Sequence, residues 1–182
     1  MSPAPAGAVE AVRRSVLAFE PGSERETESR RRFLLELDRL PEPFDRQAGP
    51  VHVTGSGFVL GPRGTVLHVH RRLGKWMQPG GHVDAGEAPW GSALRETAEE
   101  TGLEVRHPEG GPVLVQLDVH PAADDHLHLD LRYLLVCGTD ADPSPPAGES
   151  QQVRWWSLED AIGVASDEGL AEGLRRLMRL VP

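Results

Sequence analysis

One short segment, residues 81–103, constrains the fold of this chain more than any other feature. It reads GHVDAGEAPWGSALRETAEETGL and carries one arginine, Arg95, among four glutamates. Pro89 fits the first turn of a helix, where its missing N–H has no partner in any case. Gly102 stands where helices commonly end in a left-handed residue. The segment therefore predicts a glycine-bounded loop followed by a helix over residues 89–101.

The predicted helix has two different faces. At about 100° per residue, one arc expected to be buried holds Trp90, Ala93, Leu94, Thr97, Ala98 and Thr101. Glu96, Glu99 and Glu100 fall on the opposite side, where like charges three and four residues apart repel each other. Clustered oxygen ligands of this kind favour Mg²⁺ or Mn²⁺. The alternative is a solvated acidic helix face.

Charge and composition exclude several other classes of protein. The chain has 182 residues, with 19 lysines and arginines, 28 acidic residues and a formal net charge of −9. Non-specific binding to nucleic acid needs clustered cations, so we expect no stable nucleic-acid binding. We find no signal-peptide core and no apolar run of membrane-spanning length, and expect a cytoplasmic protein without membrane contact. Cys137 is the sole cysteine, which excludes an internal disulfide.

The periodicity of apolar residues changes once along the chain. Before a proline-rich linker it follows helical spacing and predicts two helices, the second capped by Ser23 with Glu26 as its capping-box partner. Beyond the linker, strands alternate with helices. Strands are predicted over residues 51–60, 65–70, 113–119, 126–137 and 153–156. We therefore expect a helical extension over residues 1–45 and a mixed α/β domain over residues 46–182.

The acidic segment resembles the signature of the Nudix hydrolases, G-x5-E-x7-R-E-U-x-E-E-x-G-U, in which U is apolar. Eight positions match at the required spacing: Gly81, Glu87, Arg95, Glu96, Glu99, Glu100, Gly102 and Leu103. Thr97 stands where the signature asks for an aliphatic residue, and this departure concerns packing because Thr97 belongs to the arc expected to be buried. The resemblance implies an α/β/α sandwich with a mixed β-sheet, to which this chain adds the N-terminal helices.

The resemblance also implies an activity and its cofactor. Nudix hydrolases cleave a pyrophosphate linkage in a nucleoside diphosphate derivative or nucleoside triphosphate by attack of water on phosphorus, with Mg²⁺ or Mn²⁺ bound. Carried over by position, the metal-binding groups are the backbone carbonyl of Gly80 and the carboxylates of Glu96, Glu99 and Glu100. Arg95 would orient these carboxylates. Structural support of the loop and helix falls to Glu87, Gly81 and Gly102.

The general base stays open between a glutamate of the helix and a carboxylate on a later loop. Glu96 is the candidate on the helix. Glu149, at the end of a loop over residues 138–150, is the first candidate outside it, followed by Asp124 and Asp125. The alternative for Glu149 is a solvated loop residue without a catalytic role.

A second polar constellation lies on the strand predicted over residues 126–137. Alternation places four polar side chains on one face of this strand: His126, His128, Asp130 and Arg132. His68, His70 and His82 add imidazoles nearby if the fold is as implied. We expect the floor of a substrate pocket, to which His82 also contributes; a solvated face and a zinc or iron site are the alternatives. Trp76, just before the glycine turn, is a candidate to stack on a base of the substrate, with packing under the loop as the favoured alternative.

Two further hypotheses compete with a hydrolase. A Nudix-like sensor would bind a nucleotide without cleaving it, although it would have no need for three intact glutamates. Isopentenyl diphosphate isomerases resemble this fold, but they require a catalytic cysteine, whereas Cys137 lies in an apolar run. We expect a small nucleotide-type substrate, and nothing in the sequence marks one derivative. The N-terminal helices could cover the pocket, pair two subunits in a homodimer, or extend the core.

Overall fold

The computed structural model describes residues 4–122 and 125–180. Two helices come first, α1 (Ala8–Ala18) and α2 (Glu24–Leu37). The later elements are β1 (Val51–Leu60), β2 (Thr65–Val69), β3 (Trp76–Met77), β4 (Gly80–His82), α3 (Pro89–Thr101), β5 (Val105–Arg106), β6 (Val113–Pro121), β7 (Leu127–Cys137), β8 (Val153–Trp156), α4 (Leu158–Val164) and α5 (Glu168–Arg179). The five strands and the carboxylate-bearing helix predicted from the sequence are all present.

The strands form two sheets. The larger has the order β4-β1-β7-β5, with β6 also paired to β7, and the smaller has the order β3-β2-β8. β1 and β7 run parallel along the whole of β1, whereas the other pairs of the larger sheet are antiparallel. The larger sheet is therefore mixed, as predicted.

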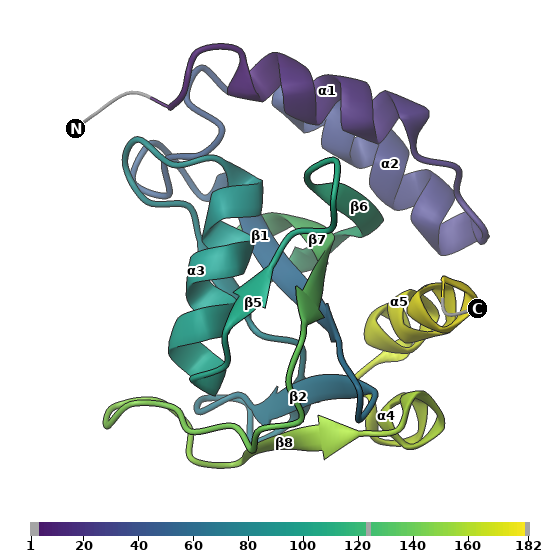
Figure 1. Ribbon diagram of the computed structural model, residues 1–182. Coiled ribbons are helices and arrows are strands. Elements are labelled where there is room, and N and C mark those ends of the chain that lie inside the picture. The colour runs from purple at the N-terminus through teal and green to yellow at the C-terminus, as the bar shows by residue number, and fades with distance from the viewer. Residues whose placement is uncertain (1–3, 123–124, 181–182) are drawn as a thin grey trace.

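Helices α3 and α5 lie on opposite faces of this sheet (Figure 1). Gly57 of β1 faces α3 so closely that a β-carbon there would overlap the hydroxyl of Thr97. The next residue, Phe58, is fully buried and packs among the leucines of α5. Because neighbouring residues of a strand point to opposite faces, β1 joins both helix layers. The layered mixed α/β fold expected from the sequence is confirmed.

The N-terminal helices α1 and α2 pack together beside one end of the sheet (Figure 1). Val12, Val16 and Phe33 are fully buried in the same hydrophobic cluster as Leu129 and Leu131 of β7. Burial of apolar side chains is the main favourable contribution to folding. The two helices therefore share a core with the domain that follows them.

The predicted capping box of α2 forms only in part. The Ser23 hydroxyl accepts a hydrogen bond from the backbone N–H of Glu26 at 3.1 Å, as expected. The Glu26 carboxylate, however, accepts from the N–H of Gly22 at 2.6 Å instead of returning to Ser23. It is buried and ion-paired at 2.6 Å with Arg176 of α5. Glu26 therefore connects the N-terminal and C-terminal helices, a role that its local pattern did not predict.

The two-faced character of α3 is confirmed with one exception. Ala93, Thr97 and Thr101 are fully buried against the sheet. Ala98, which we expected on the same face, is exposed because it lies at the edge of the predicted arc. Thr97 packs against Gly57 of β1, which accounts for a small side chain where the Nudix signature has an aliphatic one.

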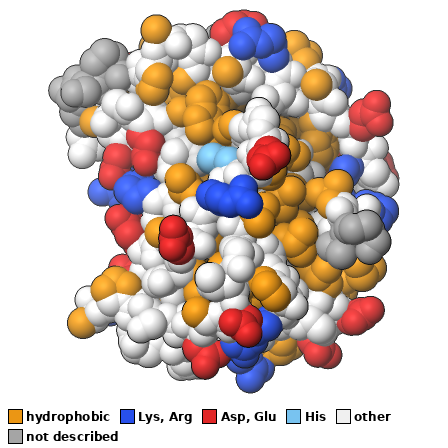
Figure 2. All heavy atoms as spheres, viewed as in Figure 1, with side chains coloured by type: hydrophobic (Ala, Val, Ile, Leu, Met, Phe, Trp, Pro, Cys, Tyr) orange, Lys and Arg blue, Asp and Glu red, His pale blue; other side chains and the backbone are white. Residues whose placement is uncertain are grey.

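The surface bears charges of both signs. In the view of Figure 2, acidic and basic side chains are interspersed rather than separated into two regions. Among the described residues, no helix combines the length and apolar character required to cross a membrane.

Candidate metal and substrate site

The glycine turn before α3 and the acidic face of α3 lie against each other. The backbone N–H of Gly80 donates a hydrogen bond to Glu100 Oε2 at 2.9 Å. A β-carbon on Gly81 would overlap the carboxylate of Glu96, and one on Gly80 would overlap Ser56 of β1. Only glycine allows the backbone this close to its neighbours. The turn and the helix thus bring a main-chain segment and two carboxylates to one place.

Arg95 is the cation at the centre of this cluster. Its guanidinium donates hydrogen bonds to Glu87 at 3.0 and 3.3 Å, to Glu96 at 2.9 Å and to Glu99 at 3.2 Å. It also donates to the backbone carbonyl of His82 at 3.0 Å. Its planar fork suits several carboxylates at once. Arg95 therefore holds the loop before α3 and two glutamates of the helix in a fixed relation.

The cluster holds more negative charge than Arg95 balances. Burial raises the pKa of Glu100 to about 8, against the hydrogen bond from Gly80, and the charges of Glu96, Glu149 and Glu99 raise it further. Burial also raises the pKa of Glu96, although Arg95 opposes this. Crowded carboxylates with raised pKa values and hard oxygen donors are what a divalent cation would stabilise. The residues present therefore fit Mg²⁺ or Mn²⁺.

Two residues far away in the sequence complete the surroundings of Glu100. The His68 ring on β2 is buried, with Nε2 3.6 Å from Glu100 Oε2. Glu149, from the loop before β8, lies close enough for its charge to act on Glu100. Asp125 is exposed. The remaining carboxylate named from the sequence, Asp124, lies outside the described residues.

Asp130 and Arg132 of β7 lie in a buried polar network. Both are 2% exposed. Asp130 Oδ1 accepts from Thr54 at 2.9 Å and from Ser56 at 2.8 Å, while its Oδ2 accepts from Arg132 at 2.9 Å. Arg132 also donates to Gln116 at 2.8 Å. The partners of these two groups are therefore other protein side chains, including Ser56 beside the glycine turn.

The other polar residues expected at the pocket are distributed over two places. His82 and His128 approach each other with ring centroids 5.3 Å apart, and His126 lies near the same group. Trp76 packs edge-on against Trp156, with centroids 5.0 Å apart. The histidines and the tryptophan expected from the sequence thus fall into separate groups.

His52, which no sequence pattern singled out above, stands at the centre of the histidine group. Its ring centroid lies 5.1 Å from that of His82 and 4.9 Å from that of His128. The alternation of His52, Thr54 and Ser56 along β1 was the available signal, because it marks a polar strand face. Which other histidines share that face depends on the strands paired with β1, and the alternation along one strand does not reveal these.

A cavity of about 720 Å³ lies beside the carboxylate cluster. Residues 41–47 of the linker form one wall, and residues 82–87 of the loop before α3 form the other. Glu87 and Glu96 line it, together with Phe44 and Arg46 from the linker. The cavity is large enough for a small-molecule ligand and combines apolar and charged walls.

The fold and the site together define a class: layered α/β proteins whose carboxylate-bearing helix faces a glycine turn. Residues 50–181 match the NUDIX domain family, and the chain belongs to this family of pyrophosphohydrolase enzymes. The match begins at the linker, after helices α1 and α2.

Individual relatives differ in their described activities. The asymmetrical bis(5'-nucleosyl)-tetraphosphatase of Caenorhabditis elegans is 31% identical over 108 residues, 56% of this chain and 72% of the relative. An isopentenyl-diphosphate Delta-isomerase of Kocuria rhizophila is 30% identical over 132 residues, 68% of this chain and 72% of the relative. A solved NUDIX-family hydrolase from Clostridium perfringens has a TM-score of 0.59 at 26% identity, over 71% of this chain and 97% of that one.

Cys137 is the sole cysteine of the chain and so the sole candidate for the catalytic cysteine that an isomerase would require. It lies buried at the end of β7 in an apolar cluster with Val59, Val66 and Trp155. Its Sγ lies 3.5 Å from the backbone carbonyl of Thr139. Cysteines buried in apolar surroundings are structural rather than reactive. The environment of Cys137 is therefore that of a structural residue.

Proposed function

We propose that this protein is a divalent-metal-dependent hydrolase that cleaves a pyrophosphate linkage in a nucleoside diphosphate derivative or nucleoside triphosphate. The observation that supports this most is the convergence of Glu96 and Glu100 on the Gly80–Gly81 turn, with more negative charge than Arg95 balances. The activity named for the C. elegans relative, on a bis-nucleosyl tetraphosphate, is consistent with a nucleotide substrate.

The residues proposed to hold Mg²⁺ or Mn²⁺ are Gly80, through its carbonyl, and Glu96, Glu99 and Glu100. When bound, such an ion neutralises pyrophosphate charge and acidifies coordinated water. Arg95 keeps the carboxylates in place through the hydrogen bonds described above. Glu149 is our candidate for the general base, since it lies on a separate loop near Glu100 and could accept the proton of the attacking water.

We further propose that the cavity between the linker and the loop before α3 receives the nucleoside part of the substrate. Glu96 and Glu87 line it, so a ligand there would have its phosphates beside the carboxylates. Phe44 offers an apolar surface, and Arg46 and His82 offer polar groups. The linker would in this way contribute to substrate choice.

The test is hydrolysis of a panel of dinucleoside polyphosphates, nucleoside triphosphates and nucleoside diphosphate derivatives, with and without Mg²⁺ or Mn²⁺. We expect metal-dependent release of nucleotide or pyrophosphate from at least one compound. Glu149→Gln should lower kcat about 100- to 10,000-fold if Glu149 is the base, with metal affinity unchanged. Metal-dependent binding without turnover of any compound would favour a nucleotide sensor and contradict the hydrolase.

A further inference from the structure

A second group of candidate metal ligands offers ring nitrogens instead of carboxylate oxygens. His52, His82 and His128 each offer a ring nitrogen, and these atoms all lie within 4.8 Å of one another. Their side chains differ in exposure: His52 is fully buried, whereas the other two are half-buried. Imidazole nitrogen suits zinc, copper and nickel, whereas Mg²⁺ prefers oxygen. The chemistry of this group therefore differs from that of the carboxylate site.

The sheet itself brings the three histidines together. His52 of β1 and His128 of β7 are direct partners across the parallel pair. His82 of β4 lies on the other side of β1, opposite Thr54, two residues along from His52. Side chains two apart on a strand share a face, so the three rings come to one surface of the adjacent strands β4, β1 and β7. This placement follows from backbone pairing and needs no particular rotamer.

The ring of His52 has unmet bonding capacity. It is 0% exposed, and apart from an approach by the backbone of Gly49, neither Nδ1 nor Nε2 has a hydrogen-bond partner. A buried polar group without a partner is costly, and most such groups in native proteins are satisfied. The neighbouring rings of His82, His126 and His128 do not supply these bonds. A cation bound by ring nitrogens would satisfy His52 without any polar side chain being added.

We propose that His52, His82 and His128 form a transition-metal site, separate from the carboxylate site, that binds Zn²⁺ or another ion preferring nitrogen ligands. Three histidines with a fourth position open are a recurrent arrangement for zinc. Nitrogens about 2.0–2.1 Å from one tetrahedral ion lie roughly 3.4 Å apart, so movements of about an ångström bring these rings onto it. His82 lines the cavity, which places the ion at the cavity edge.

Substitution of Arg46 is expected to have opposite effects on a cation site and on an anion site at these histidines. Its guanidinium lies 3.4 Å from Nδ1 of His82, whereas the carboxylates of Asp84 and Asp130 act on His82 and His128 with the opposite charge. A positive side chain weakens a site for a cation and strengthens one for an anion such as phosphate. Arg46→Gln should therefore raise the affinity for Zn²⁺, whereas it would lower the affinity of an anion site.

The experiment uses the full chain with Glu96→Gln and Glu100→Gln, so that the carboxylate site is removed, after treatment with a chelator. Calorimetry with Zn²⁺ and visible absorption with Co²⁺ should report one ion per chain and the spectrum of a tetrahedral nitrogen-ligated ion. Adding His128→Gln or His52→Gln should weaken binding by at least about 100-fold, since loss of even an outer-shell partner costs about 10- to 100-fold. His107→Gln, a histidine outside the cluster, is the control.

Two results of these binding measurements would overturn the proposal. No binding of Zn²⁺ or Co²⁺ by the carboxylate-free chain would overturn the proposal, as would equal affinity with and without His128. Circular dichroism checks that each variant folds, and if His52→Gln does not fold, the His128→Gln comparison decides. Weaker Zn²⁺ binding in Arg46→Gln would also count against it. Because no substrate is used, this result does not depend on the proposed hydrolase activity.

Discussion

The Glu100 carboxylate is held between the backbone of Gly80 and the carboxylate of Glu96, and only 16% of its side chain is exposed. Burial and the surrounding negative charges raise its pKa to about 8, so the ionised form is unfavourable without a cation. The same repulsion would favour a bound divalent ion. The buried charge of Glu100 that would bind a metal ion therefore lowers the stability of the metal-free protein.

Glu100→Gln should make the metal-free protein more stable while abolishing metal-dependent hydrolysis. A glutamine keeps an oxygen for the Gly80 N–H and removes the buried charge, so we expect a gain on the order of 1–3 kcal/mol at pH 8. The measurement is urea unfolding in the presence of a chelator. The matched control is Glu99→Gln, whose side chain is 53% exposed, with an expected change within about 0.5 kcal/mol. A less stable Glu100→Gln variant would contradict this account of the charge.

At the scale of elements, the position of α3 depends on small residues in β1. A β-carbon on Gly55 would overlap the backbone carbonyl of Pro89, and one on Gly57 would overlap Thr97. The first of these neighbours is backbone, which has no rotamer to change. The close approach of helix and strand therefore sets where the carboxylates of α3 lie relative to the Gly80–Gly81 turn.

Gly55→Ala should destabilise the protein and lower its activity, because α3 must move away from β1. Forcing extra volume into a packed interface costs about 1–3 kcal/mol, which thermal or urea unfolding will show. Gly163→Ala is the control, since a β-carbon there meets nothing within 4 Å. It lies inside helix α4, where alanine is favoured over glycine by about 0.5–1 kcal/mol. Equal effects of the two substitutions would show that the contact with Pro89 is unimportant.

Local sequence patterns predicted where the helices and strands lie, but not which residues from distant parts of the chain contact one another. The helix over residues 89–101 followed from its two faces, its first-turn proline and its terminal glycine. The partners of His52 and the approach of Glu149 to Glu100 depend on the order of strands and the path of a loop, which periodicity does not encode. The polar face of β7 was predicted from alternation, but not that Asp130 and Arg132 of that face would be buried in a polar network.

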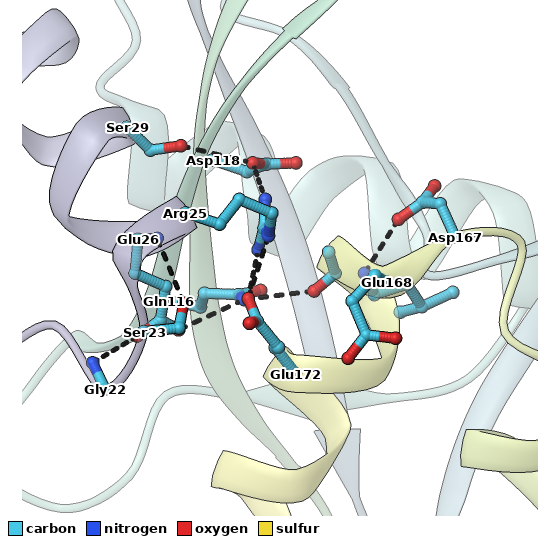
Figure 3. A network of polar contacts seen from close by, with 12 residues as sticks. Gly22, Ser23, Arg25, Glu26, Ser29, Gln116, Asp118, Asp167, Glu168 and Glu172 are labelled. Carbon is cyan, nitrogen blue, oxygen red and sulfur yellow. Dashed lines mark hydrogen bonds and ion pairs between the residues drawn. The ribbon is translucent and has the colours of Figure 1, made fainter.

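At the scale of the whole molecule, a polar network joins helix α2 to the core and to the C-terminal helix (Figure 3). Arg25 of α2 is ion-paired with Asp118 of β6 and, at 2.7 Å, with Glu172 of α5. Asp118 also pairs with Arg132 of β7 at 3.3 Å. Because each of these groups comes from a different element, the network fixes their relative positions. It lies on the same face of β7 as Asp130, which contacts Ser56 beside the glycine turn.

Asp118→Asn should cost stability at neutral pH and much less in acid. Burial alone would raise the pKa of Asp118, but the imidazole of His120, whose Nδ1 lies 3.3 Å away, and the charges of Arg132 and Arg25 hold it well below its ordinary value. A carboxylate with a lowered pKa in the folded state contributes stability above its ordinary pKa of about 3.9, and this contribution is lost as the pH falls toward the lowered value. Removing one partner of a buried charged pair costs about 3–5 kcal/mol.

Urea unfolding from pH 7 to pH 3 measures this difference between the native protein and Asp118→Asn. The two curves should begin to converge as the pH falls below about 4, because Asp118 then takes up a proton in the unfolded chain while the folded protein still holds it ionised. Other titratable groups face Asp118, namely His120, Asp130 and Asp167, so the comparison uses the difference between the two proteins rather than either curve alone. Asp142→Asn, at a side chain 85% exposed, should leave the native profile unchanged. A constant difference across the whole pH range would mean that Asp118 acts through packing and not through its charge.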